Sequence, residues 1–315
     1  EWAGQNWTVD ARVDYTVYDS SNATYKYTIN NSIPYDGYAT EITISSQVTA
    51  TDYTYKLVLD SSWDGWSYVS SDGSDIFFTD ENGDPLYYYI EYFNTTSQEA
   101  IIYVMIPSLS TTTKIYMFYG GTSNPCSSYH DQSRAFLFYD DFDTLSSSWI
   151  IVSGSPSMTV SNSILTIEYG SNWYVALDGY VFTDFIVEAN MSSGGANPEL
   201  SGLVGRGKID TETYYAFAGY GDPSETAIYV YVDGTKTRAE TSGITYDPLT
   251  WHIRTLVFKG TQILAYFDND LHLNITDSTI ANGTVGFRGL NSIAYVDWIR
   301  AVSYTHLTLP TTERV

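Results

Sequence analysis

Paired carboxylates are the first chemistry to look for, because hydrolysis of a glycosidic bond needs two carboxyl groups. One protonates the leaving oxygen and the other acts as nucleophile or base. The nearest candidates are Glu188 in the segment FIVEAN and Asp210 with Glu212 in IDTET, and they are not paired at an alternating spacing on a strand. We therefore predict that the chain is not an enzyme, and we assign no catalytic residue.

Histidine offers acid–base catalysis or zinc binding. Outside the last thirteen residues the chain has His130, His252 and His272. None of them lies in a strand–serine–helix elbow or in a His-x-x-x-His zinc spacing. We expect His252, in TWHIR, to lie on a strand face as a packing or hydrogen-bonding residue.

Aromatic side chains suggest a second kind of site. Trp63, Trp66 and Trp173, together with the tyrosines, could form flat platforms for sugar rings, with Asp and Asn side chains holding the hydroxyls. Aromatic residues in strands more often belong to the core or to cross-strand ladders. Both interpretations stay open.

Composition limits the partners and favours strands. Charged residues are 16% of the chain, against roughly 25% in an average protein, and the net charge is −23. Such a charge repels nucleic acid and anionic membrane surfaces, so we exclude nucleic acid as a partner. β-branched and aromatic residues are plentiful and no amphipathic helix is evident, which favours strands.

Seven Asn-x-Ser/Thr sequons suggest an extracellular location, because sequons matter only outside the cytosol. Chance in a Ser/Thr-rich sequence is the alternative explanation. The single Cys126 excludes an internal disulfide and is expected to be a buried or idle thiol. The expected glycosylation sites are Asn6, Asn22, Asn30, Asn94, Asn190, Asn274 and Asn282.

The beginning of the chain alternates apolar and polar residues with the period of a strand that buries one face. We expect this strand, within residues 1–24, to pair with another subunit by strand addition, or to form an edge strand of its own domain. The apolar positions of this assembly strand are Val9, Ala11, Val13, Tyr15 and Val17.

Short strand-like segments separated by turn residues continue to about residue 302. We predict an all-β fold with two tandem antiparallel β-sandwich (jelly-roll-like) domains, residues 25–138 and 139–302. The Asn82-Gly83 pair predicts a type I′ hairpin turn, with positive φ at both residues.

Several segments of the first domain, DGSDIFFTDENGDPLYYYIEYF, AIIYVMIPSLSTTTKIYMFYGG and FYDDFD, resemble the domain of unknown function 2341 family over residues 25–138. The resemblance implies a β-sandwich in a surface or secreted protein and assigns no catalytic residue.

The second domain resembles the concanavalin A-like lectin and glucanase (LamG-like) superfamily over residues 139–302. The resemblance rests on strand pairs around residues 251–273 and on GFRGLNSIAYVDWIRAV near the end. It implies a possible structural calcium ion at Asp141, Asp143 and Asp297. Alternatively, Asp297 caps a strand and pairs with Arg288 or Arg300. The Glu-x-Asp-x-(x)-Glu strand of laminarinase-like members is not found in the sequence.

Residues 303–315 resemble a translated transposase adapter from a sequencing library, which would indicate a metagenomic origin. We exclude them from the fold expectations. We identify no signal peptide and no apolar stretch long enough to span a bilayer.

These observations lead to three functional hypotheses. The first is an extracellular structural or adhesive surface protein, a glycosylated filament or surface-layer subunit whose partners are copies of itself. The second is a carbohydrate-binding protein that uses the concanavalin-like domain to bind surface glycans. The third and weakest is an unrecognised glycoside hydrolase.

Overall fold

The computed structural model describes residues 16–19, 28–29, 33–34, 37–46, 49–197, 200–220 and 225–304. Within these ranges the chain divides into two compact units, with the boundary between Leu137 and Phe138. We call them the first and the second unit and describe each by itself. The predicted all-β fold is confirmed, with sandwich-type sheets and few helical residues.

The first unit contains β1 (Thr16–Asp19), β2 (Thr28–Ile29), β3 (Ile33–Pro34), β4 (Tyr38–Ser45), β5 (Ala50–Leu59), β6 (Phe77–Asp80), β7 (Pro85–Leu86), β8 (Tyr88–Asn94), β9 (Glu99–Leu109) and β10 (Thr112–Tyr119). Its helical turns are η1 (Asp64–Ser67), η2 (Ser127–Tyr129) and α1 (Gln132–Ala135).

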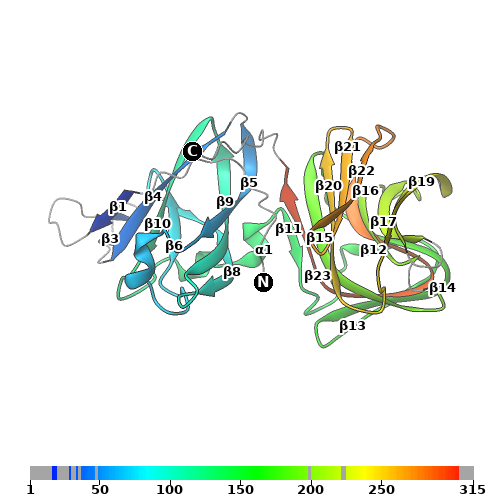
Figure 1. Cartoon of the computed structure of the whole chain (residues 1–315), viewed down its shortest axis with the longest axis horizontal. Helices are drawn as coiled ribbons and strands as arrows, with labels where there is room; N and C mark the ends of the chain where they lie inside the picture. The colour runs from blue at the N-terminus through cyan, green and yellow to red at the C-terminus, as the bar shows by residue number, and fades with distance from the viewer. Residues whose placement is uncertain are drawn as a thin grey trace. The chain divides into compact units, whose positions relative to one another are not determined.

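Two antiparallel sheets form the sandwich of the first unit, one in the order β1-β4-β10-β6-β7 and the other in the order β5-β9-β8 (Figure 1). In β4, Ile42 and Ile44 are buried while Thr43 is less so, as the period of two requires. Ile42 packs in one core with Leu57 of β5 and Ile102 of β9, so apolar side chains of both sheets fill the space between them.

The Asn82-Gly83 turn joins β6 to β7, but its predicted type is wrong. Only Gly83 has a positive φ, of 85°. The Asp80 carboxylate accepts hydrogen bonds from the backbone N–H groups of Asn82 (2.9 Å) and Asp84 (2.8 Å). These bonds hold the turn with one left-handed residue instead of two.

The second unit contains β11 (Phe138–Asp140), β12 (Trp149–Ser153), β13 (Ser157–Ser161), β14 (Ile164–Leu177), β15 (Phe185–Gly195), β16 (Gly202–Gly207), β17 (Tyr214–Tyr220), β18 (Glu225–Val232), β19 (Thr235–Thr245), β20 (His252–Lys259), β21 (Gln262–Phe267), β22 (Asp270–Thr276) and β23 (Thr284–Ser303).

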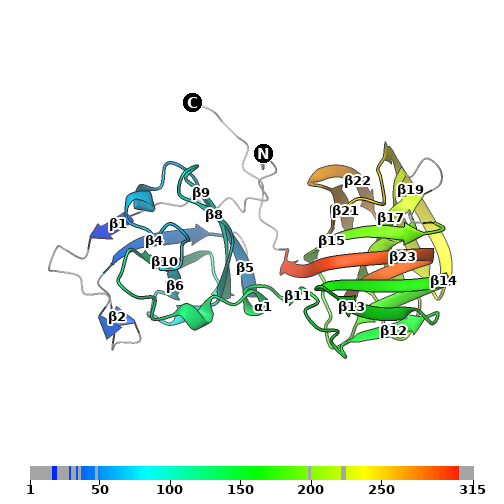
Figure 2. The ribbon, with the colours of Figure 1, turned by 90° about the horizontal axis from the view of Figure 1, so that it is seen from below.

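The long strand β23 organises the second unit. It pairs with β14 along much of its length (Figure 2), and also with β16 near its start and with β15 further on. Trp149 and Phe287 lie with ring centroids 5.4 Å apart, and Phe185 and Phe258 4.9 Å apart. These buried rings are part of the core that the sheet encloses.

Candidate functional site

Two adjoining pockets open in the first unit, where the segments after β5 and after β10 meet, and β8 lines the second of them. Their volumes are about 410 and 460 Å³, and both are open to solvent. Ser74 and Asn124 line both of them. Because Tyr68 lines the first pocket and Tyr92 the second, we call the pair the Tyr68–Tyr92 groove.

The segment before the groove is held by two buried tryptophans. Trp66 donates from Nε1 to the carbonyl of Asp60 at 2.7 Å, and its ring lies 4.9 Å from that of Trp63. A Cβ atom at Gly65 would fall 2.1 Å from the Trp63 ring, so this position needs glycine. Packing against these rings fixes the turn that leads to Tyr68.

Asn124 anchors the opposite wall. Its Nδ2 donates to the carbonyl of Ile76 at 2.8 Å and lies 3.2 Å from the hydroxyl of Tyr88, while its Oδ1 accepts from the N–H of Cys126 at 2.9 Å. Burial raises the pKa of Tyr88 to about 12 and that of Cys126 to about 11. The Tyr88 phenol and the buried Cys126 thiol therefore stay protonated and structural at neutral pH.

Two exposed tyrosines flank the groove. Tyr68 is 49% exposed and Tyr92 is 41% exposed. The Tyr68 ring lies 4.2 Å from that of Tyr38, which supports it from within the sheet. The two phenol rings thus offer apolar surface beside polar groups, the combination that sugar rings require.

Polar groups of different kinds line the space between these rings. Asp72 is exposed, and hydrogen bonds from Ser74 and Ser70 lower its pKa, so it is ionised at neutral pH. The His130 ring stays exposed on one side and stacks on Tyr88 with ring centroids 5.1 Å apart, and partial desolvation lowers its pKa. Its Nε2 accepts from the N–H of Ile90 at 3.3 Å, as a neutral ring can. The groove thus combines hydrogen-bond donors and acceptors.

The tryptophans considered as sugar platforms are in the core instead. Trp63, Trp66 and Trp173 are 2%, 7% and 1% exposed. The core interpretation of these three residues is therefore correct, and the exposed rings of the groove, Tyr68 and Tyr92, were not singled out from the sequence.

The carboxylates weighed for catalysis belong to the second unit, whereas the groove belongs to the first. Glu188 on β15 accepts a 2.7 Å hydrogen bond from Arg300 Nε and forms an ion pair with it. Glu212 accepts from the hydroxyl of Ser153, and Asp210 is exposed in the turn before β17. The Glu188–Arg300 pair stabilises the sheet where both strands meet.

His252 begins β20 and fixes the loop before it. Its Nδ1 lies 2.6 Å from Asp268 Oδ2, and its Nε2 lies 2.6 Å from Thr250 Oγ1. The same Nε2 is 3.0 Å from the carbonyl of Asp247, and the Thr250 hydroxyl is 3.1 Å from that carbonyl. The Asp247 carbonyl can accept from both His252 Nε2 and the Thr250 hydroxyl. These contacts tie the loop to the strand, so Thr250 and His252 do not form a free nucleophile–base pair.

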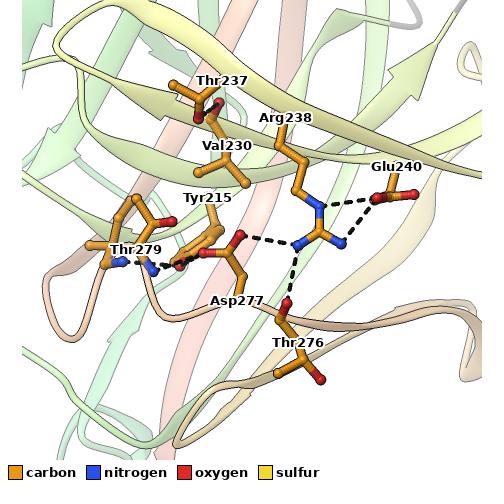
Figure 3. A network of polar contacts seen from close by, with 9 residues as sticks. Tyr215, Val230, Thr237, Arg238, Glu240, Thr276, Asp277 and Thr279 are labelled. Carbon is orange, nitrogen blue, oxygen red and sulfur yellow. Dashed lines mark hydrogen bonds and ion pairs between the residues drawn. The ribbon is translucent and has the colours of Figure 1, made fainter.

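A second polar network fixes the edge strand β19. Figure 3 shows Arg238 between Glu240 and Asp277, with ion-pair distances of 3.0 and 3.1 Å. Burial alone would raise the pKa of Asp277, but hydrogen bonds from Thr279, Tyr215 and Arg238 outweigh it and lower the pKa to about 2. The ionised Asp277 therefore links β19 to the segment after β22.

The residues expected to bind calcium have polar partners of their own. Asp143 accepts from the Ser163 hydroxyl at 2.7 Å, and Asp297 on β23 accepts from Asn190 Nδ2 at 3.0 Å. Asp141 lies between β11 and Asp143. Within the described ranges no three His, Cys, Asp or Glu side chains form a group that could hold a metal ion. The calcium site stays a prediction.

Four expected glycosylation sites are described. Asn274 and Asn282 are exposed, and Asn94 and Asn190 are partly buried. The Asn190 amide, which glycosylation would modify, donates to Asp297. Glycosylation stays a prediction at all seven positions, of which Asn6, Asn22 and Asn30 lie outside the described residues.

The expected assembly strand is described only in part. Val17 lies in β1 and pairs with Thr40 of β4 in the same chain, as an edge strand of its own domain would. Strand addition to another subunit stays a prediction. Its other expected positions, Val9, Ala11, Val13 and Tyr15, lie outside the described residues, as do residues 305–315 of the adapter-like tail.

The fold defines an all-β protein of sandwich type. In comparisons with known proteins, a family model matches part of the chain. The model of the domain of unknown function DUF2341 matches residues 72–153. The match begins at residue 72, after the expected start at residue 25, and ends at residue 153, after the expected end at residue 138. No curated protein matches the chain. No helix in the described part of the chain is long and apolar enough to cross a membrane.

Solved structures with a similar fold include the carbohydrate-binding module CBM66 from Bacillus subtilis, with 15% identity and a TM-score of 0.45 over 50% of this chain and 96% of that one. The Bacillus licheniformis β-glucanase has 13% identity and a TM-score of 0.40 over 53% and 98%. The Crh5 transglycosylase has 14% identity and a TM-score of 0.41 over 54% and 85%.

These comparisons overturn the prediction that the chain is not an enzyme, because a glucanase and a transglycosylase are among the similar folds. The missing carboxylate motif excludes one arrangement of catalytic groups on one strand, and catalysis can use others. At TM-scores of 0.40 to 0.45 the likeness assigns no activity to this chain. The finer expectation of a LamG-like second domain stays a prediction.

Proposed function

We propose that the protein binds glycans and that the Tyr68–Tyr92 groove is the binding site. The observation that carries the proposal is the pairing of two exposed tyrosine rings with two adjoining pockets. Sugar rings stack on aromatic faces and are oriented by a few polar groups, here Asp72 and Ser74. Seven sequons support an extracellular location for this binding.

The walls of the groove are held before any ligand arrives. Asp75 accepts from Ser70 on one wall and from the N–H of Gly120 on the other. Asn124 bonds the carbonyls of Ser74 and Ile76 across the same gap. A groove that is already ordered costs less conformational entropy on binding, which favours affinity.

Glycan-array screening followed by titration calorimetry tests the proposal. We expect binding to fall about tenfold or more in Tyr68→Ala and in Tyr92→Ala, because exposed aromatic anchors contribute much of the binding energy. Tyr180→Ala is the matched control, since Tyr180 is 39% exposed in the second unit. Binding that survives both groove substitutions but is lost in Tyr180→Ala would contradict the assignment of the site.

A further inference from the structure

The charge of the groove narrows the class of glycan. Among the described residues that line the two pockets, none is a lysine or an arginine, while Asp72, Asp75 and Glu91 are carboxylic acids. His130, the remaining titratable base of the lining, has a lowered pKa and is neutral at neutral pH. The chain as a whole carries a net charge of −23. The groove is thus acidic and lies in an acidic protein.

The three acids are not equivalent. Asp75 is committed to the walls, because Ser70 donates to its Oδ1 and Gly120 to its Oδ2. Glu91 accepts from the Tyr103 hydroxyl at 3.3 Å. Asp72 is exposed, and its Oδ1 accepts from the Ser70 hydroxyl at 3.0 Å and from the N–H of Ser74 at 3.1 Å. A carboxylate has about four acceptor positions, so Asp72 can accept from a ligand as well.

We propose that the groove selects glycans with free amino groups, such as oligomers of glucosamine, and that Asp72 binds the ammonium group. The inference rests on the proposed function and names its ligand class. Asp72 lines the same pocket as Tyr92 and shares hydrogen bonds with Ser74, where the two pockets meet. A sugar stacked on Tyr92 can therefore present its ammonium group to a fixed carboxylate. Uronate or sulfated sugars meet repulsion from the same group.

The test compares three oligosaccharides of equal length by calorimetry at mildly acidic pH, where sugar amines are protonated. They are a glucosamine oligomer, its N-acetylated form and a galacturonate oligomer. We expect the glucosamine oligomer to bind most tightly and the galacturonate oligomer least. Asp72→Asn should weaken binding of the glucosamine oligomer about fivefold and leave the N-acetylated form unchanged. Added salt should weaken binding of the glucosamine oligomer and leave binding of the N-acetylated form unchanged, because salt screens charges.

Glu81→Gln is the matched control, because it also removes one negative charge at an exposed position, outside the groove lining. Equal binding of the glucosamine and N-acetylated oligomers, an Asp72→Asn effect no larger than that of Glu81→Gln, or a preference for galacturonate would overturn the inference. In each case tyrosine-dependent binding still supports the proposed function. If binding of none of the three oligomers depends on Tyr68 or Tyr92, both the inference and the proposed site are contradicted. If another glycan from the array binds in a way that depends on these tyrosines, only the inference is contradicted.

Discussion

The carboxylate of Asp75 joins the two walls of the groove, because its Oδ2 accepts a 2.6 Å hydrogen bond from the backbone N–H of Gly120. Its Oδ1 accepts from the N–H of Ser70 at 3.0 Å. Replacement by Asn puts an amide N–H against one of these donors. We expect Asp75→Asn to lower the free energy of unfolding by about 1–3 kcal/mol in urea denaturation. Glu81→Gln should change it by less than about 0.5 kcal/mol, and equal effects would show that the link is unimportant.

The core of the second unit can be tested with two tryptophans of opposite exposure. Trp173 is 1% exposed and Trp251 is 44% exposed. Trp173→Ala leaves a cavity and should cost about 3–5 kcal/mol of unfolding free energy. Trp251→Ala should stay within about 0.5 kcal/mol of the wild type. Similar losses in the two variants would contradict the described burial.

The Glu188–Arg300 ion pair is largely buried, with side-chain exposures of 14% and 10%. Glu188→Ala removes the carboxylate that accepts from Arg300 Nε and should lower the free energy of unfolding by about 1–3 kcal/mol. The double variant Glu188→Met with Arg300→Met removes both charges and should recover most of that loss. Chemical denaturation of the three proteins measures this coupling, and a double variant no more stable than Glu188→Ala argues against it.

His272 makes stability depend on pH. Burial lowers its pKa below the ordinary 6.5, although Asp270 and Asp268 partly oppose this, and its Nδ1 lies 2.8 Å from Thr226 Oγ1. The unfolded chain then takes up the proton at a higher pH than the folded chain. The contribution is therefore fully present above pH 6.5 and is lost as the pH falls through the lowered pKa.

The pH prediction compares urea denaturation of the wild type and of His272→Gln at about pH 7.5 and about pH 5. We expect acidification to destabilise the wild type more than the variant, because the glutamine side chain does not titrate. An equal loss in both proteins would show that other groups cause the dependence.

The strand positions could be predicted from the sequence, whereas the groove could not. The alternation that buries Ile42 and Ile44 is local, so a period of two reveals it. Whether a single aromatic ring is exposed cannot be predicted from its immediate neighbours in the sequence. Trp66 and Tyr68 are two residues apart, yet one is 7% and the other 49% exposed, since η1 turns the chain between them. The walls meet through Ser74 and Asn124, which are 50 residues apart in the sequence.

A signal for the groove did exist in the two turn-rich segments that follow strands. One carries Ser70, Asp72 and Ser74 after the tryptophans, and the other begins at Gly120-Gly121 and reaches Asn124. Nothing in a single sequence states that these two segments face each other. Their pairing follows from the sheet order, in which β6 lies beside β10.

Hydrogen–deuterium exchange with and without a saturating glycan hit from the array tests the location of the binding site most directly. In the wild type, the glycan should slow exchange of backbone amides in residues 68–76, 88–93 and 120–127, which line the groove. In the double variant that carries both Tyr68→Ala and Tyr92→Ala, the same glycan should leave exchange of these amides unchanged. Protection confined to residues 138–304 while the glycan is bound would place the site in the second unit and contradict the account.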